Sequence, residues 1–260
     1  LRLQYLDQGE FDLSKLFNFK NNLLVSSTNY PQYMFYGTKS QINILSVGGN
    51  FGSTDDLVVA SFETKPKYTS DRDIISAVWK HYPHLINLVK MVNFLGKEML
   101  VVCRDDGRVS LYDTETLVQQ LQEFLLRKAR FEKSRVQQQL LDLLLSIHSF
   151  EVKPTFQLRT AKSVWGIDVY EKYDLLAILD NSRRITVFHY SKEHDGGSFY
   201  SVISHPLASN VPDISFIKDD ENKAEKEEEE DIGDDLPLVP LHTRVLLSAG
   251  AIMGELVIFE

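Results

Sequence analysis

Hydrophobic residues along this chain occur in short runs that are separated by polar turns. The first three runs span residues 23–28, 33–37 and 41–47, and Asn29 and Pro31 lie between the first two. The runs are rich in β-branched and aromatic residues, which favour extended structure, whereas Asn and Pro favour turns. The pattern therefore predicts three short β-strands joined by tight turns.

This pattern returns three times along the chain. Each repeat has an alternating strand, an apolar strand, a tight polar turn and a closing strand of the form apolar-x-apolar-aromatic. We place four units at about residues 23–47, 88–113, 163–190 and 211–260. The closing strands lie further apart than the ~40–45 residues of an ordinary propeller repeat, so we expect long insertions between the units.

The turn of the second unit carries the clearest hairpin signal. Asp106 and Gly107 follow an apolar strand, and glycine adopts a positive φ without the steric cost that other residues meet. In the third unit the matching turn is Asp180-Asn181-Ser182, which we expect to serve the same purpose less well.

The sequences of the insertions between the units predict a different structure for each insertion. Residues 55–82 begin with an extra strand at 57–62 and continue as a polar loop. Residues 191–210, which contain two adjacent glycines and a proline, are predicted to form a loop.

Residues 114–148 are predicted to form a helical insertion. Apolar residues such as Leu117 and Leu121 recur at spacings of three and four, and neither Pro nor Gly interrupts them. One long helix and a helical hairpin both fit this pattern, and Asp113 or Thr114 is expected to cap its start.

Five basic residues gather within this helical insertion. They are Arg127, Lys128, Arg130, Lys133 and Arg135. Such a run is usually a solvated helix face, and the alternatives are contact with nucleic acid, with an acidic partner or with the acidic run of the same chain. The only aromatic residue among them is Phe131, which argues against stacking on single-stranded nucleic acid.

The formal net charge of −9 comes from residues 219–235, which lie in an acidic loop at 218–236. Residues 219–235 hold eleven acids and two bases, so the rest of the chain is formally neutral. The densest part of the loop is Glu227, Glu228, Glu229 and Glu230. Its low apolar content predicts a disordered loop that keeps the protein soluble, and the alternatives are binding of a basic partner such as a histone tail and mimicry of nucleic acid.

No catalytic, cofactor-binding or metal site is predicted, and we expect a protein that is not an enzyme. Cys103 ends an apolar strand and is expected to be core rather than a nucleophile. His81 and His84 flank a proline without a cysteine or carboxylate pair at metal-site spacing, so they are assigned to a polar turn. The glycine-dense loop at 48–52 lacks the spacing of a phosphate-binding loop.

The stretch from Cys103 to Asp113 resembles the end of a WD repeat, with Tyr112-Asp113 in place of Trp-Asp. The strand that ends at Phe188 matches the same pattern more loosely, and Gly-His dipeptides are absent from the sequence. The resemblance implies an all-β, WD40-like β-propeller with a helical insertion and a disordered acidic loop. We expect the four units to be part of a larger, seven-bladed propeller.

A narrower resemblance rests on the phrase at residues 163–169, which contains Trp165 and Asp168, and on the strands at 175–188. These residues are similar to the fungal WD-repeat family named for constitutive ribonucleotide reductase transcription. The resemblance implies a nuclear regulator of ribonucleotide reductase genes, linked to a cullin-type ubiquitin ligase in genome maintenance. Propellers that dock on ligase adaptors often carry Arg two residues after the Trp-Asp-type pair, whereas this chain has Glu115 and Ser191 there.

Asp168 lies on the strand that would be nearest the central channel of a propeller. It is expected to bond a neighbouring backbone group or hydroxyl, and the alternative is a position on the channel wall.

These patterns favour a non-catalytic interaction scaffold that binds other proteins, among them a ubiquitin-ligase adaptor. The alternatives are a chromatin factor that contacts nucleic acid or histones, a general WD-repeat assembly factor unrelated to transcription, and an enzyme that uses the propeller channel. The single cysteine is typical of a reducing compartment, and the apolar stretch at 140–147 is too short to span a bilayer. We therefore expect a nuclear or cytoplasmic protein, neither secreted nor membrane-bound, that begins inside a larger chain.

Overall fold

The computed structural model describes most of the chain outside its N-terminus and several long connections. The described residues are 22–47, 58–133, 150–192, 197–211, 213–217, 246–250 and 256–259. They form two compact units, which we treat separately: Leu1–Trp165 with Asp180–Ser182, and Gly166–Leu179 with Arg183–Glu260.

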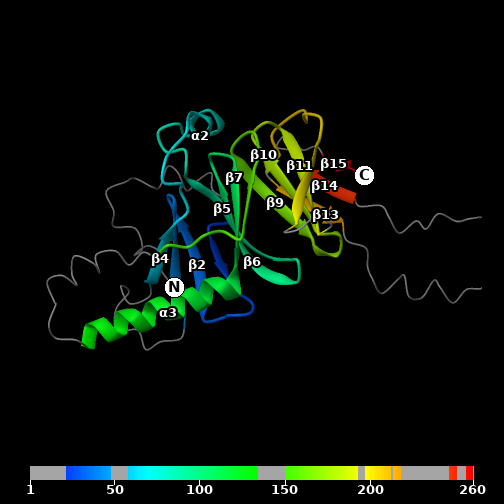
Figure 1. Ribbon diagram of the computed structural model, residues 1–260. Coiled ribbons are helices and arrows are strands. Elements are labelled where there is room, and N and C mark those ends of the chain that lie inside the picture. Colours follow the sequence, from blue (N-terminus) through cyan, green and yellow to red (C-terminus); the bar gives the residue numbers. More distant parts are fainter. Residues whose placement is uncertain are drawn as a thin grey trace, which may run out of the picture. The chain divides into compact units, whose positions relative to one another are not determined.

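Two four-stranded antiparallel sheets make up most of the first unit (Figure 1). The first sheet contains β1 (Leu24–Ser26), β2 (Tyr33–Thr38), β3 (Gln41–Ser46) and β4 (Val58–Glu63) in that order. The second contains β5 (Ile86–Phe94), β6 (Lys97–Arg104), β7 (Arg108–Asp113) and β8 (Phe156–Arg159), again in chain order.

Two further antiparallel sheets follow in the chain. The third sheet contains β9 (Val164–Tyr170), β10 (Leu175–Asp180), β11 (Arg184–Ser191) and β12 (Ser198–Ile203), with a short 3-10 helix, η3 (Glu171–Tyr173), after β9. The described part of the fourth contains β13 (Asp213–Ile217), β14 (Leu246–Gly250) and β15 (Leu256–Phe259).

Every sheet is a meander in which each strand pairs with its neighbour in sequence. A four-stranded meander of this kind is the structural unit of a propeller blade. The prediction of an all-β, WD40-like fold is therefore confirmed, while the expected total of seven blades stays a prediction.

The prediction that residues 191–210 form a loop is wrong, because these residues include β12. This strand pairs with β11 along its whole length, from Thr186 opposite Ile203 to Ser191 opposite Ser198. Its sequence, Ser-Phe-Tyr-Ser-Val-Ile, contains the aromatic and β-branched residues that favour strands, and it forms the edge of its sheet. Gly197, just before the strand, has a φ of +70°, which suits the end of a hairpin connection.

The polar loop predicted after the extra strand at 57–62 also needs correction. The strand is present as β4, but the following segment contains a short helix, α2 (Asp71–Ser76). Ser70 and Asp73 form a capping box, in which the Ser70 side chain accepts from the Asp73 N–H and the Asp73 side chain accepts from the Ser70 N–H. This reciprocal pair satisfies two backbone donors and starts the helix.

The helical insertion begins where it was predicted, as α3 (Thr114–Lys133). Asp113 is the cap, because its Oδ1 accepts a hydrogen bond of 3.2 Å from the N–H of Thr116. The rest of the predicted insertion, residues 134–148, lies outside the described residues.

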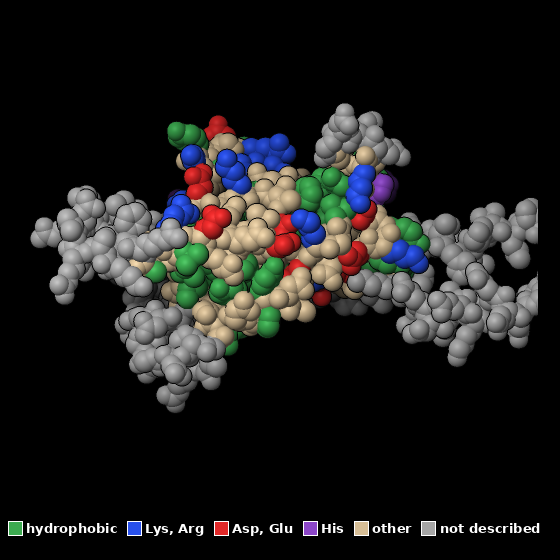
Figure 2. All heavy atoms as spheres, turned by 60° about the horizontal axis from the view of Figure 1, so that its bottom comes forward, with side chains coloured by type: hydrophobic (Ala, Val, Ile, Leu, Met, Phe, Trp, Pro, Cys, Tyr) green, Lys and Arg blue, Asp and Glu red, His purple; other side chains and the backbone are tan. Residues whose placement is uncertain are grey.

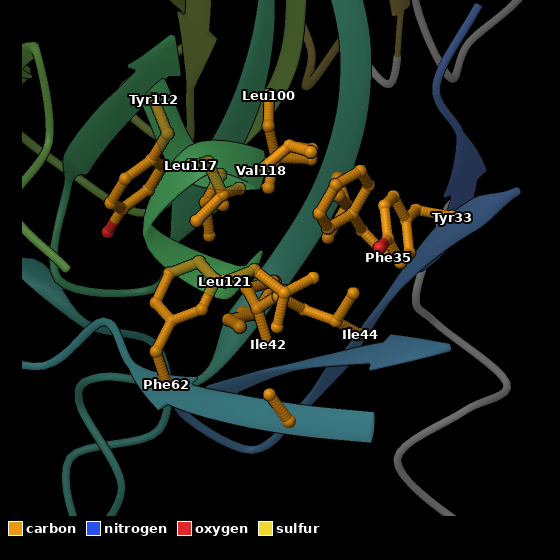
Figure 3. Packing of buried hydrophobic residues seen from close by; sticks show 14 residues of the cluster. Tyr33, Phe35, Ile42, Ile44, Phe62, Leu100, Tyr112, Leu117, Val118 and Leu121 are labelled. Atoms are coloured by element: carbon orange, nitrogen blue, oxygen red, sulfur yellow. The ribbon is translucent and has the colours of Figure 1, made fainter. Parts of the chain in front are cut away.

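One hydrophobic core joins α3 to the first two sheets (Figure 3). Leu117, Val118 and Leu121 are buried on one face of the helix, and Phe62 and Tyr112 meet edge to face at 5.2 Å between ring centroids. Burial of each large apolar side chain stabilises the fold by about 1.5–3 kcal/mol. The spacing of three and four residues in α3 is thus explained by its contact with the sheets.

The turns that join the second and third strands of two sheets differ in their backbone. Gly107 has a φ of +83°, as predicted for the turn between β6 and β7. In the turn between β10 and β11 the positive φ belongs to Arg183, at +62°, rather than to the predicted Asp180-Asn181-Ser182. The carboxylate of Asp180 accepts from the Ser182 N–H at 2.8 Å and shapes this turn from its side chain.

Candidate functional site

A buried cluster of charged side chains surrounds the turn between β6 and β7. Arg104 and Asp106 are fully buried, and the Arg104 guanidinium donates to both carboxylate oxygens of Asp106, at 3.3 and 3.2 Å. His84 lies just before β5, and its Nδ1 is 2.8 Å from Asp106 Oδ2. Asp106 also accepts from the backbone and side chain of Arg108. One carboxylate therefore holds three cationic or imidazole groups at the same end of the second sheet, where β5 and β7 begin and β6 ends.

A second buried carboxylate connects this cluster to α2. Asp73 is fully buried, and its Oδ1 lies 3.0 Å from Arg108 Nη2 and 2.9 Å from Arg159 Nη2. Because Asp73 also caps α2, the same side chain starts the helix and fixes it to the second sheet.

The electrostatics of the cluster favour the ionised carboxylates. Burial raises the pKa of Asp106, but the hydrogen bond from His84 and the charges of Arg104 and Arg108 outweigh it, and the net pKa is lowered. Burial likewise works to raise the pKa of Asp73, and Ser70, Arg108 and Arg159 bring it below its ordinary value. Burial lowers the pKa of Arg104, and Asp106 opposes this.

Three side chains of the cluster carry atoms that can ligate a metal ion. Ligand atoms of Asp73, His84 and Asp106 lie within 4.8 Å of one another. Three guanidiniums, from Arg104, Arg108 and Arg159, already neutralise these carboxylates, and a divalent cation would meet their charges at close range. Both ring nitrogens of His84 also have partners, in Asp106 and Thr69. We therefore assign the cluster to structural ion pairing.

A polar network continues from the cluster and fixes the segment after α2. Asp105 Oδ2 accepts from the N–H of Trp79 at 2.7 Å, and its Oδ1 accepts from the Ser163 hydroxyl at 2.6 Å. Lys162 Nζ donates to the carbonyl of Ile75 at 2.9 Å. The N–H of Ser163 donates to the carbonyl of Ser76 at 3.1 Å. The backbone around α2 is therefore tied down at several points.

The same segment presents large apolar side chains to solvent. We call residues 65–82 the α2 surface. Its exposed apolar members are Tyr68, Ile74, Ile75, Val78, Trp79 and Tyr82. Tyr68 is 87% exposed, Ile75 66% and Tyr82 53%. Exposed bases, Lys67, Arg72 and Lys80, are interspersed with them along the segment.

The face of the molecule drawn in Figure 2 carries charges of both signs. Figure 2 shows acidic and basic side chains interspersed with hydrophobic ones on one face of the molecule. This matches the formal neutrality of the sequence outside the acidic loop.

The predicted repeat residues of the second sheet have structural roles, and one buried residue, His84, was not predicted. Asp106 and Gly107 lie at the centre of the charged cluster, Tyr112 is core, and Asp113 caps α3 and pairs with Lys97. His84, which we assigned to a polar turn, is instead buried against Asp106. The available signal was its position just before an apolar strand, whose start lies opposite the end of the next strand, where Asp105 and Asp106 follow.

The repeat residues of the third sheet have structural contacts. The carboxylate of Asp168 accepts from the Phe216 N–H at 2.8 Å, which is the backbone bonding that the sequence favoured over a channel position. Asp180 accepts from the Lys162 N–H at 3.0 Å. Phe188 is buried and meets Phe199 edge to face at 6.4 Å. Trp165 is half-buried on β9, and its indole Nε1 is buried without a hydrogen-bond partner among the described residues.

The predicted partner-binding charges are described only in part. Arg127 is exposed on α3, where its Nε donates to the carbonyl of Glu123 at 3.3 Å, and Lys128 is half-buried. Arg130 and Lys133 belong to α3, but their side chains are not described. The remaining predicted charges lie outside the described residues; they are Arg135, Glu227, Glu228, Glu229 and Glu230. Their roles in binding stay predictions.

Cys103 is buried in β6, as expected for a core residue. Burial raises the pKa of its thiol to about 12, so the thiolate that a nucleophile needs is strongly disfavoured. Among the described helices, none has both the length and the apolar composition to cross a bilayer.

Comparison with known proteins gives a family match over most of the chain. The model of the CRT10 family matches residues 3–227. Protein CRT10 of Saccharomyces cerevisiae is 23% identical over 219 residues, which cover 76% of this chain and 21% of that protein. The chain thus spans about a fifth of the length of this curated relative.

Solved β-propellers are also similar to the chain. Sqt1 of Saccharomyces cerevisiae matches with a TM-score of 0.48 and 8% identity, over 91% of this chain and 44% of that one. The WD40 propeller domain of Doa1 matches with a TM-score of 0.44 and 11% identity, over 91% and 49%. The propeller domain of Cps50 (Swd1) from Myceliophteria thermophila matches with a TM-score of 0.45 and 12% identity, over 91% and 52%.

Proposed function

Because this chain belongs to the CRT10 family, we propose that it is a non-catalytic WD-repeat interaction scaffold that regulates transcription of ribonucleotide reductase genes. The family resemblance seen in the sequence implies this role, together with a link to a cullin-type ubiquitin ligase in genome maintenance. Both functions require a nuclear protein that binds other proteins, and we propose that location and that activity for the full chain.

One structural observation supports the scaffold role most directly. The α2 surface is fixed through Asp73 and Asp105 to the second sheet and its turn, and through Lys162 to the connection after β8, and it still exposes Ile75 and Trp79. Exposed apolar side chains on a rigid backbone bind a partner without a further ordering cost in the loop. Larger apolar patches on soluble proteins commonly mark interaction sites.

The link to the ligase does not rest on the arginine that adaptor-docking propellers often carry. Glu115, which occupies that place in the second sheet's repeat, lies in the first turn of α3 and is exposed. An acidic side chain there is favoured by the helix N-terminus instead. We therefore propose that contact with a ligase adaptor uses another surface.

The proposed function is tested with the full-length protein carrying an affinity tag at its chromosomal locus. Purification at low salt should recover stable protein partners, including a ligase adaptor, that a strain with the tag alone does not yield. Deletion of the gene should raise ribonucleotide reductase transcripts, and the intact gene should restore them. A partner-free monomer together with unchanged transcripts would refute the proposal.

A further inference from the structure

We infer that the α2 surface binds an acidic peptide segment of another protein in which large apolar side chains alternate with carboxylates. This inference rests on the proposed scaffold function and names the partner chemistry of one surface. It is carried by the apolar content, the charge and the rigid attachment of residues 65–82.

The apolar content indicates what the ligand must bury. Ile75, Val78 and Trp79 are exposed within five consecutive positions, and Tyr82 follows them by one turn, with its N–H donating to the Trp79 carbonyl at 2.8 Å. Aliphatic and aromatic side chains that protrude together are complementary to other apolar side chains. Aromatic residues are also the usual anchors of interfaces, since they bury much area with few rotatable bonds.

The charge of the surface indicates that the ligand is acidic. Lys67, Arg72 and Lys80 are exposed, whereas Asp71 is the one exposed acid of the segment. The other acid, Asp73, is buried and neutralised by Arg108 and Arg159. The solvent-facing side of the α2 surface is therefore net positive, and it complements carboxylates that flank apolar anchors.

The attachment of the segment makes this a preformed site. Asp105 holds the Trp79 backbone at 2.7 Å, and Lys162 and Ser163 hold the carbonyls of Ile75 and Ser76 at 2.9 and 3.1 Å. None of these bonds uses an exposed side chain of the α2 surface. Ile75, Val78 and Trp79 are thus exposed to a ligand while the backbone below them is fixed.

The aliphatic residues distinguish a peptide from nucleic acid. Lys, Arg, Trp and Tyr would also suit a single-stranded nucleic acid, whose bases stack on aromatic rings. Ile74, Ile75 and Val78 offer no stacking face and would be left against water or phosphate. A peptide with apolar side chains covers them, so the observations favour a peptide.

The test measures binding of synthetic peptides to the full chain by fluorescence anisotropy. The first probe alternates Asp with Leu and Phe, the second replaces Leu and Phe by Ser, and the third replaces Asp by Lys. The first probe should bind at least about tenfold more tightly than the other two, because it alone supplies both anchors and charge. Equal affinity for the first and second probes would overturn the inference.

Variants of the chain locate the site. The double variant Ile75→Ser, Trp79→Ala should weaken binding of the first probe by at least about tenfold. The charge reversal Lys67→Glu, Arg72→Glu should weaken the first probe and strengthen the third. A matched control, Tyr200→Ala with Val202→Ser, removes exposed apolar side chains from β12 and should leave binding within about twofold. All variants change exposed side chains, and thermal melting verifies that they fold.

Three further measurements distinguish a partner peptide from the other molecules that could bind the α2 surface. If deletion of residues 218–236 raises the affinity for the first probe by about tenfold, the chain's own acidic loop competes for the surface and the inference of a separate partner is overturned. Tighter binding of oligo(dT), lost in the same variants, would overturn it in favour of nucleic acid. Partners that co-purify with the wild type and with Ile75→Ser, Trp79→Ala alike would leave the scaffold function standing while refuting this site.

Discussion

Nδ1 of His84 lies 2.8 Å from Oδ2 of Asp106, and this contact ties the entrance of β5 to the turn between β6 and β7. Asp106 is also bonded to Arg104, which is fully buried, so the turn is held from inside the protein. A buried charge that loses its partner is costly, because neither water nor another group compensates it. The stability of the second sheet should therefore depend strongly on this carboxylate.

Replacing Asp106 by Ala should lower the free energy of unfolding by about 3–5 kcal/mol, because Arg104 would stay buried without its counter-ion. Denaturant titration followed by circular dichroism measures the change. Glu151→Ala, which removes an exposed carboxylate from a connection, is the matched control and should stay within about 0.5 kcal/mol of wild type. A loss below about 1 kcal/mol for Asp106→Ala would show that the pair behaves like a surface salt bridge.

Stability should fall in acid because of the same cluster. The folded-state pKa values of Asp73 and Asp106 are lowered, so both groups favour the folded state above the unfolded-state pKa of about 3.9. That contribution is lost as the pH falls through the lower, folded-state values. Melting temperatures should therefore show little dependence on these groups between about pH 5 and 7, and a steep decline below about pH 4.

The variant Asp106→Asn tests the cause of this acid sensitivity. Its side chain does not titrate, so the variant should be less stable than wild type at neutral pH and should lose less of its stability in acid. Parallel curves for the two proteins would show that other carboxylates govern the acid transition.

Two glycines with positive φ provide a matched pair for testing the β6–β7 turn. A Cβ at Gly107 would lie 2.9 Å from the Lys162 carbonyl oxygen and 3.0 Å from that of Thr160, whereas a Cβ at Gly96 would meet nothing within 4 Å. Gly96→Ala should cost about 1 kcal/mol from backbone strain alone. Gly107→Ala should cost about 2–4 kcal/mol, because a steric clash adds to the strain. Equal unfolding midpoints for the two variants would contradict the close approach.

The sequence predicted those features that depend on local chemistry. Asp106 and Gly107 predict a hairpin turn, because few residues other than glycine adopt the positive φ that Gly107 has there. Leu117 and Leu121 predict a helix, because their spacing matches the helical period and both are buried on one face. His84 was missed because its partners, Asp106 and Thr69, are brought to it only by the folded sheet. The α2 surface was missed for a related reason: Asp73, paired with Arg108 and Arg159, fixes a segment in whose sequence apolar and charged residues are mixed.

Glu98 links the first two sheets, and this contact gives the last prediction. Its side chain is buried, and its carboxylate accepts from the Ser27 hydroxyl at 2.6 Å and from the N–H groups of Thr28 and Asn29 at 2.6 and 3.2 Å. Glu98→Ala leaves these donors unpaired and should cost about 2–4 kcal/mol, whereas Glu98→Gln keeps one acceptor oxygen and should cost less. Hydrogen exchange should show faster exchange of the Thr28 and Asn29 amides in Glu98→Ala, with the amides of β6 and β7 changing less. Uniformly faster exchange throughout both sheets would mean that Glu98 supports global stability rather than holding this turn.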